Sequence, residues 1–190
     1  MATSATARTT LQSRLAAEAS DGPVVLTFLP EEARFSLRVA EANRAVAAEA
    51  FGVALPASIG ELSTGEGGRR ALCLGPDEWM LYAPESEGVA TAEAFATRYD
   101  EAPHSLVDIS DREIALSLEG PEATTLLSVG CPSDPREIPL GAGRRTVFDG
   151  VTVVLHRDAE ERFRMEVWRS FLPHVWALLN TANRELASGF

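Results

Sequence analysis

Hydrophobic and polar residues alternate in several short stretches of the chain, as in β-strands with one buried face. In ARFSLRVA (33–40), every second residue from Phe35 to Val39 is apolar, and the arginines and serine between them face the other way. The same alternation occurs at 112–120 and 162–169. These stretches predict strands that each place one face on a core.

Further elements follow from apolar runs, helical spacing and the residues that end helices or make turns. The helices expected are 41–52, stopped by Gly52; 86–99; 121–130, opened by Pro121 and closed by Gly130; and 170–186, capped by Ser170. The remaining strands expected are 23–30, a hairpin over 69–84 turning at Gly75-Pro76, 105–109, and 144–157 with a turn at Asp149-Gly150. We expect a polar, glycine-bearing loop at 61–68.

The order strand–strand–helix–strand–strand–helix therefore occurs twice along the chain. The tripeptide GRR stands before the third strand region each time, at 68–70 and 143–145. Repeated element order favours an internal duplication. We predict an α+β fold of mainly antiparallel sheets with helices, forming one compact domain over 23–190 that contains two ββαββα-like repeats, 24–100 and 104–184.

The first 22 residues carry no such pattern. They are rich in alanine, serine and threonine, with arginines but no acid before Glu18. This composition is compatible with an organelle transit peptide, but we favour a polar, flexible N-terminal arm over 1–22.

Charge and cysteine content exclude several classes of protein. The net charge is −11, from 28 acids against 17 bases, all of them arginine. An acidic chain without a basic cluster is a poor candidate for binding nucleic acid or anionic membranes. No apolar run approaches the roughly 20 residues of a membrane span. The two cysteines, Cys73 and Cys131, are far apart, which excludes a disulfide framework and fits a reducing cytoplasm.

No catalytic or metal-binding motif stands out. The histidines, His104, His156 and His174, lack metal-ligand spacing, and no nucleophile elbow or phosphate-binding loop is present. Cys131 follows a helix C-terminus, whose negative potential raises a thiol pKa. Cys73 lies within a strand, where a small core residue is expected. We therefore predict no catalytic, cofactor-binding or metal-binding residue in this chain.

The three tryptophans differ in their surroundings. Trp79 and Trp176 lie among apolar residues, where core packing is expected. Trp168 ends a strand and precedes Arg169, and these residue types are enriched in interface hot spots. Together with Arg112, which lies in the DISDRE segment (108–113), they form a candidate subunit interface: Arg112, Trp168 and Arg169.

Five stretches together resemble the gamma subunit family of heterotetrameric sarcosine oxidase. They are LGPDEWMLYAP (74–84), SLVDISDRE (105–113), LLSVGCPSDP (126–135), RRTVF (144–148) and FRMEVWRSFLPHVWALL (163–179), in the family's order. The resemblance implies a flavoenzyme complex of four different subunits that demethylates sarcosine oxidatively. It also implies that flavin, NAD, folate and zinc lie in the alpha, beta and delta partner subunits, with no cofactor in this chain.

The resemblance further implies the fold of the folate-binding domain of the glycine cleavage aminomethyltransferase. In that family a later strand carries an acid for aminomethyl chemistry, after a glycine pair. The comparable stretch here is FDGVTVVLHR, where Asp149 precedes the glycine and the acid's place holds Thr152 or Val153. Without a charge there, iminium stabilisation has no evident agent.

These observations give two main hypotheses. The first is a non-catalytic structural subunit of a cytoplasmic sarcosine oxidase-type complex. The second is a stand-alone folate-dependent one-carbon transferase, or a folate-binding module without chemistry. The DISDRE segment is interpreted as a turn, because Asp108, Ser110 and Asp111 favour side-chain hydrogen bonds to nearby backbone amides.

Overall fold

The computed structural model describes residues 11–19 and 21–189. The strands are β1 (Val25–Phe28), β2 (Glu32–Val39), β3 (Leu62–Thr64), β4 (Arg70–Gly75), β5 (Glu78–Pro84), β6 (His104–Asp108), β7 (Glu113–Glu119), β8 (Gly143–Phe148), β9 (Val151–Ala159) and β10 (Arg162–Trp168). The main helices are α2 (Arg44–Phe51), α3 (Gly88–Ala96), α4 (Ala123–Ser128) and α5 (Leu172–Ala187). Short 3-10 turns occur at Glu41–Asn43, Glu66–Gly68, Glu85–Glu87 and Pro135–Glu137.

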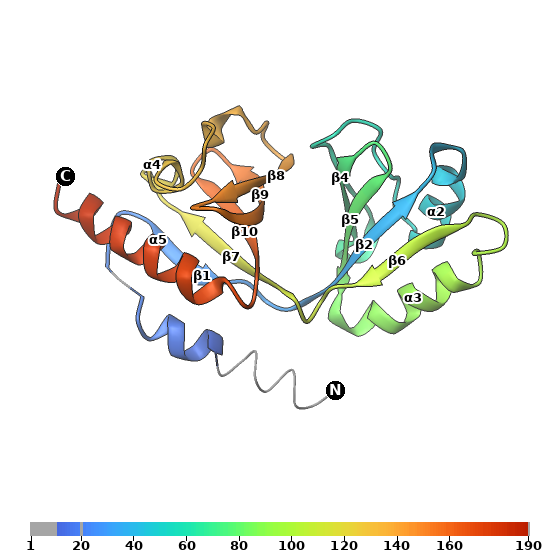
Figure 1. Ribbon diagram of the computed structural model, residues 1–190, viewed down its shortest axis with the longest axis horizontal. Coiled ribbons are helices and arrows are strands. Elements are labelled where there is room, and N and C mark those ends of the chain that lie inside the picture. The colour runs from blue at the N-terminus through green and yellow to red at the C-terminus, as the bar shows by residue number, and fades with distance from the viewer. Residues whose placement is uncertain (1–10, 20, 190) are drawn as a thin grey trace. The chain divides into compact units, whose positions relative to one another are not determined.

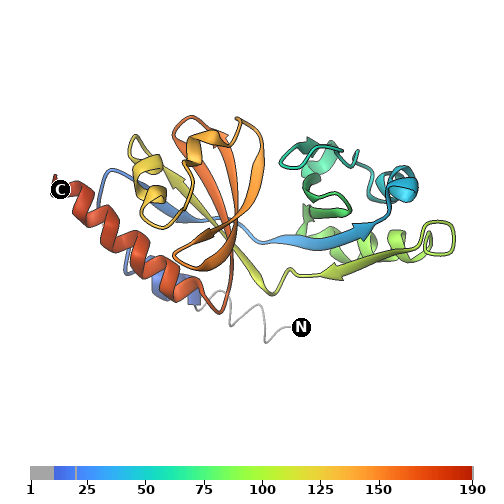
Figure 2. The same ribbon diagram turned by 45° about the horizontal axis from the view of Figure 1, so that its top comes forward.

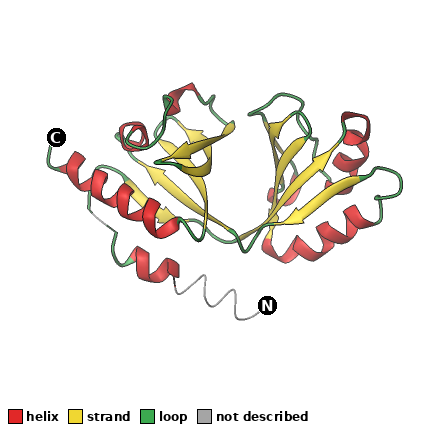
Figure 3. Cartoon of the chain, viewed as in Figure 1, coloured by secondary structure: helices red, strands yellow, loops and turns green. Residues whose placement is uncertain are grey.

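The strands form two five-stranded sheets (Figures 1 and 3). One sheet has the order β1-β7-β10-β9-β8 and the other the order β3-β4-β5-β2-β6. The pairs β1–β7, β7–β10 and β10–β9 are antiparallel, as are β3–β4, β4–β5, β5–β2 and β2–β6. The predicted α+β fold with mainly antiparallel sheets is confirmed.

The two compact units of the chain are not contiguous in sequence. Unit 1 comprises Met1–Pro30, Asp111–Gly141 and Arg145–Phe190, and unit 2 comprises Glu31–Ser110 with Ala142–Arg144. Each half of the sequence has the order ββαβββα. The first strand of each half, however, pairs with a strand of the other half. Strand β1 pairs with β7, and strand β6 pairs with β2. The chain thus divides into two compact units, where the sequence predicts one compact domain over 23–190, and the repeats 24–100 and 104–184 stay a prediction.

The core of unit 2 lies between its sheet and the helices α2 and α3 (Figure 3). The alternating residues Phe35 and Leu37 of β2 are fully buried there, as the pattern predicts. Phe51 of α2 and Phe95 of α3 meet with ring centroids 6.5 Å apart. Gly52 then ends α2 in the left-handed conformation, at φ 78°, which favours glycine.

In unit 1, α5 lies along one face of the sheet in both ribbon views (Figures 1 and 2). The alternating positions Ile114, Leu116 and Leu118 of β7 are fully buried. Trp176 of α5 stacks on Phe28 of β1, with ring centroids 4.7 Å apart. The contact between Phe28 and Trp176 joins β1 to α5, the helix that covers the sheet in which β1 pairs with β7.

Three local predictions differ from the structure. The polar loop 61–68 contains the short edge strand β3. Ser170 does not cap α5, because the helix starts at Leu172 with Phe171 in the cap position and no side-chain cap bond. Arg34, on the expected polar face of β2, is fully buried, and its Nη1 donates to the Glu32 carbonyl at 3.1 Å.

The predicted flexible arm over 1–22 contains a short helix. Residues 11–16 are helical and Leu15 is buried, and the flexibility of the arm stays a prediction. Residues 1–10 and 20 of the predicted arm lie outside the described residues.

Candidate functional site

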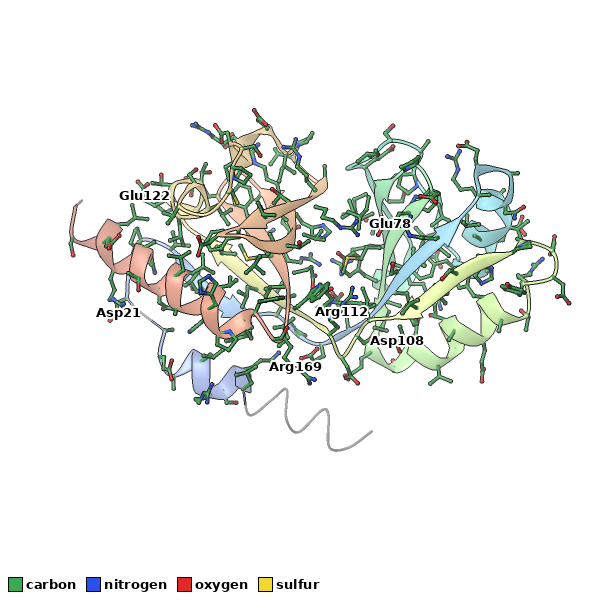
Figure 4. The ribbon with its side chains drawn as sticks, viewed as in Figure 1. Asp21, Glu78, Asp108, Arg112, Glu122 and Arg169 are labelled. Carbon is green, nitrogen blue, oxygen red and sulfur yellow. The ribbon has the colours of Figure 1, made fainter. Side chains whose placement is uncertain are left out.

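The three candidate interface residues meet at one corner of unit 1. β10 ends at Trp168, which lies opposite Glu113, the first residue of β7. The Arg169 amide donates to the Arg112 carbonyl at 2.7 Å, which extends the pairing by one step. The chain turns directly after this pair to begin α5, and Arg112 and Arg169 lie where β7 begins and β10 ends (Figure 4).

Arg112 is held over the indole of Trp168. Its guanidinium carbon lies 4.6 Å from the Trp168 ring centroid, a cation–π geometry. Its Nε donates to Oε1 of Glu113 at 3.1 Å, and its Nη2 forms an ion pair with the same oxygen at 3.1 Å. The Glu113 side chain is only 6% exposed and the Arg112 side chain 45%. A buried carboxylate thus fixes an arginine that remains accessible.

Two large rings reach the surface beside this arginine. Trp168 is 38% exposed and Phe171 is 45% exposed. Their ring centroids are 6.1 Å apart, and the Phe171 amide donates to the Trp168 carbonyl at 2.9 Å. We call the group Arg112, Trp168, Arg169 and Phe171 the aromatic corner.

An open pocket of about 300 Å³ adjoins the aromatic corner. Asp111, Arg112, Arg169 and Ser170 line it, so it brings together the turn before β7 and the turn after β10. Polar and charged groups therefore border an aromatic surface, which is the composition expected of an interface hot spot with its rim.

The first half of the DISDRE segment has a structural role within unit 2. Oδ1 of Asp108 accepts from the Ser110 amide at 2.9 Å and from the Ser110 hydroxyl at 2.6 Å. The Ser110 hydroxyl in turn accepts from the Arg34 amide at 2.9 Å, and the Ile109 amide donates to the Arg34 carbonyl at 2.8 Å. The segment thus closes an Asx turn and extends the pairing of β6 with β2.

The cysteines lack the environment of a nucleophile. Burial raises the pKa of the Cys131 thiol to about 11. The sequence also predicts a raised pKa for Cys131, but from the potential of a helix C-terminus, whereas in the structure the cause is desolvation by burial. Burial also raises the pKa of Cys73, which has no exposed surface and donates to the Gly75 carbonyl.

The histidines lie in three separate surroundings. His104 contacts the Ala102 carbonyl at 2.7 Å through Nδ1, and His156 is buried in β9. His174 pairs with Asp149 at 2.8 Å on the surface. Among the described residues, no group of histidines, cysteines and acids is placed to hold a metal ion.

The two remaining tryptophans are core residues. Trp79 is buried, and its Nε1 donates to the Pro56 carbonyl at 2.9 Å. Trp176 is 2% exposed. On β9, Thr152 is exposed and Val153 is buried, so neither position carries a charged group.

Sequence reasoning missed Phe171 and Glu113 as members of this site. The helix predicted over 170–186 includes Phe171, but in the structure this residue precedes α5 and faces solvent. Its position three residues after Trp168 was the available signal, because a turn at that spacing brings the two rings together. The alternation predicted at 112–120 places Glu113 on the polar face of its strand, but the structure buries this residue.

A family model describes most of this chain. The model of the "Sarcosine oxidase, gamma subunit family" matches residues 38–185. The chain belongs to that family. The resemblance drawn from the five sequence stretches is therefore confirmed.

Curated relatives in the family agree over most of their length. The sarcosine oxidase subunit gamma of an Arthrobacter species is 31% identical over 182 residues, 94% of this chain and 89% of that protein. The subunit gamma of Corynebacterium sp. strain U-96 is 33% identical over 148 residues, 77% of this chain and 71% of that protein.

Solved structures extend the comparison to the fold. A chain of the heterotetrameric sarcosine oxidase from Corynebacterium sp. U-96 matches with a TM-score of 0.81 and 31% identity, covering 93% of both chains. The glycine cleavage system aminomethyltransferase T from Bartonella henselae matches with a TM-score of 0.63 and 16% identity, covering 87% of this chain and 47% of that one. The second match shows a shared fold and confirms the predicted aminomethyltransferase-like architecture.

Proposed function

We propose that this chain is a non-catalytic structural subunit of a cytoplasmic sarcosine oxidase-type complex. The other subunits carry out the oxidative demethylation of sarcosine to glycine. One observation carries this proposal: a chain that matches a subunit of a heterotetrameric enzyme along 93% of its length presents an exposed aromatic corner. Exposed large rings beside arginine are typical of surfaces that bind other proteins.

The chemistry of the chain supports a structural role. Catalysis by a thiol requires a thiolate, and the raised pKa of Cys131, about 11, keeps that group protonated near neutral pH. Thr152 and Val153 offer no charge to stabilise a cationic intermediate. We place the flavin, NAD, folate and zinc of such a complex in the alpha, beta and delta partner subunits.

We further propose that the aromatic corner forms part of the contact with another subunit. Arg112 and Trp168 are already fixed by Glu113 and by each other, so little side-chain entropy would be lost on binding. The structure contains, among the described residues, no helix that could span a bilayer.

Spectroscopy and activity of the purified chain test the catalytic part of the proposal. We expect the full chain to be colourless after desalting, to contain no stoichiometric metal, and to show no turnover of sarcosine. A flavin absorbance band or activity in the isolated chain would contradict the proposal.

A folate titration separates the structural role from the folate-binding alternatives. We expect no saturable binding of tetrahydrofolate to the isolated chain in isothermal calorimetry. Binding in the micromolar range would favour a folate-binding module, and aminomethyl transfer to bound folate would favour a transferase.

A further inference from the structure

The pocket beside the aromatic corner is bordered by unused hydrogen-bond donors. A guanidinium carries five N–H groups in a planar fork. Among the described residues, the Arg112 guanidinium bonds to Glu113 through Nε and Nη2, which leaves both protons of Nη1. In the part of the chain that the structure describes, no carboxylate forms an ion pair with Arg169. Two arginines that line one pocket therefore retain donors for an external acceptor.

The acids near the pocket do not supply that acceptor. Glu113 is buried and already bonded to Arg112. Asp111 lines the pocket but takes part in another interaction within the chain. The charges of Asp111, Glu113, Arg112 and Arg169 sum to zero, so the pocket does not attract anions by net charge. It instead offers N–H donors that point at a single acceptor group.

The surface next to the donors favours a protein ligand over a small ion. The exposed rings of Trp168 and Phe171, with centroids 6.1 Å apart, adjoin the arginines that line the pocket. A free carboxylate or phosphate would leave these rings in water. A polypeptide can place an acidic side chain on the arginines and an apolar side chain on the rings, and so bury both parts of the surface.

We propose that the pocket lined by Asp111, Arg112, Arg169 and Ser170 receives an aspartate or glutamate side chain from another subunit, while an apolar neighbour of that residue packs on Trp168 and Phe171. The proposal rests on the proposed function and specifies the chemistry of the partner segment. Arg169 forms the new ion pair, and Arg112 contributes Nη1 without giving up Glu113. A carboxylate and a guanidinium fork make paired, charge-assisted hydrogen bonds, so the orientation of the partner is also fixed.

Charge variants in the assembled complex test this proposal. The full chain is co-expressed with the other subunits of its complex, and subunit dissociation is measured by sedimentation over a range of sodium chloride concentrations. We expect Arg169→Ala to weaken association about tenfold or more, as for truncation of an interfacial charge pair. Arg169→Glu is expected to weaken it further, and Arg169→Lys to restore part of the loss. Arg184→Ala is the matched control, because Arg184 is an exposed arginine of α5 whose Nη2 donates to the Thr181 hydroxyl of the same helix.

The salt dependence gives an independent readout. If Arg169 pairs with a carboxylate, the wild-type complex dissociates more readily as salt rises, and Arg169→Ala flattens that dependence. Association unchanged in Arg169→Glu would overturn the proposal. If Trp168→Ala disrupts the complex while Arg169→Glu does not, the proposal of a partner carboxylate is wrong, but the aromatic corner is still a subunit contact. If the isolated chain dimerises and Trp168→Ala abolishes the dimer, the occupant is a second copy and the proposal fails.

Discussion

The side-chain amide of Asn183 bonds to both backbone groups of Val24, as a neighbouring strand would. Its Oδ1 accepts from the Val24 amide at 3.1 Å, and its Nδ2 donates to the Val24 carbonyl at 2.8 Å. The side chain is fully buried in α5, and a side chain at Gly22 would collide with it. One amide therefore joins the start of β1 to the helix that covers its sheet.

We predict that Asn183→Ala lowers the free energy of unfolding by about 2–4 kcal/mol, because two buried backbone groups lose their partners. Urea denaturation followed by circular dichroism measures this change. The neighbouring Arg184→Ala serves as control and should stay within about 0.5 kcal/mol of the wild type. An equally small effect of Asn183→Ala would show that water replaces the amide.

The raised pKa of Cys131, about 11, gives a second prediction at this scale. Near pH 8 only about one thiol in a thousand is ionised, so alkylation by iodoacetamide should be slow and rise about tenfold per pH unit up to that pKa. Mass spectrometry under native conditions should find Cys131 modified before the buried Cys73. The raised pKa also makes stability depend on pH, because the folded state binds the Cys131 proton more tightly than the unfolded state. This contribution to the free energy of unfolding is fully present below the ordinary thiol pKa and is lost as the pH rises toward 11. Rapid alkylation of Cys131 at neutral pH would contradict this assignment.

At the scale of elements, local patterns located most strands and helices. The alternation at β2, β7 and β10 predicted which side chains face the core, and Gly52 marked the end of α2. The pattern could not reveal β3, because Leu62–Thr64 is three residues long and has a neighbour on one side only. Nor could it show that Arg34 and Glu113, both on polar sides of strands, are buried.

The aromatic corner was predicted in part. Trp168 and Arg169 are adjacent in sequence, and their residue types alone suggested a contact surface. Arg112 is more than fifty residues away, and the register of β7 with β10 places it beside them. The pocket depends on that register and on the turn into α5, neither of which a local pattern specifies.

The tryptophans Trp168 and Trp176, which lie on either side of the turn between β10 and α5, should respond differently to truncation. Trp168 is 38% exposed at the end of β10, and Trp176 is 2% exposed on α5. We predict that Trp168→Ala lowers the free energy of unfolding of the lone chain by about 1–2 kcal/mol, from partial burial and a cation–π contact. Trp176→Ala should cost about 3–5 kcal/mol, as for core aromatics. Thermal and urea denaturation of both variants provide the comparison. A loss from Trp168→Ala as large as that from Trp176→Ala would make Trp168 a core residue and remove it from the interface.

At the scale of the whole molecule, the sequence could not predict that β1 pairs with β7 and β6 with β2. Each strand has only four or five residues, and periodicity does not identify the partner with which a strand pairs. The element order still indicated a duplication, because each half repeats the same succession of strands and helices. The family match agrees with the resemblance found in stretches between residues 74 and 179.

Native mass spectrometry of the co-expressed complex tests the central claim most directly. The chain is purified by an affinity tag together with the other subunits, and each released subunit is weighed with whatever cofactor it retains. We predict that this chain enters the complex and is released at the mass of its polypeptide, while flavin and metal stay with other subunits. A chain that elutes alone, or one that is released with a bound flavin or folate, would contradict the account.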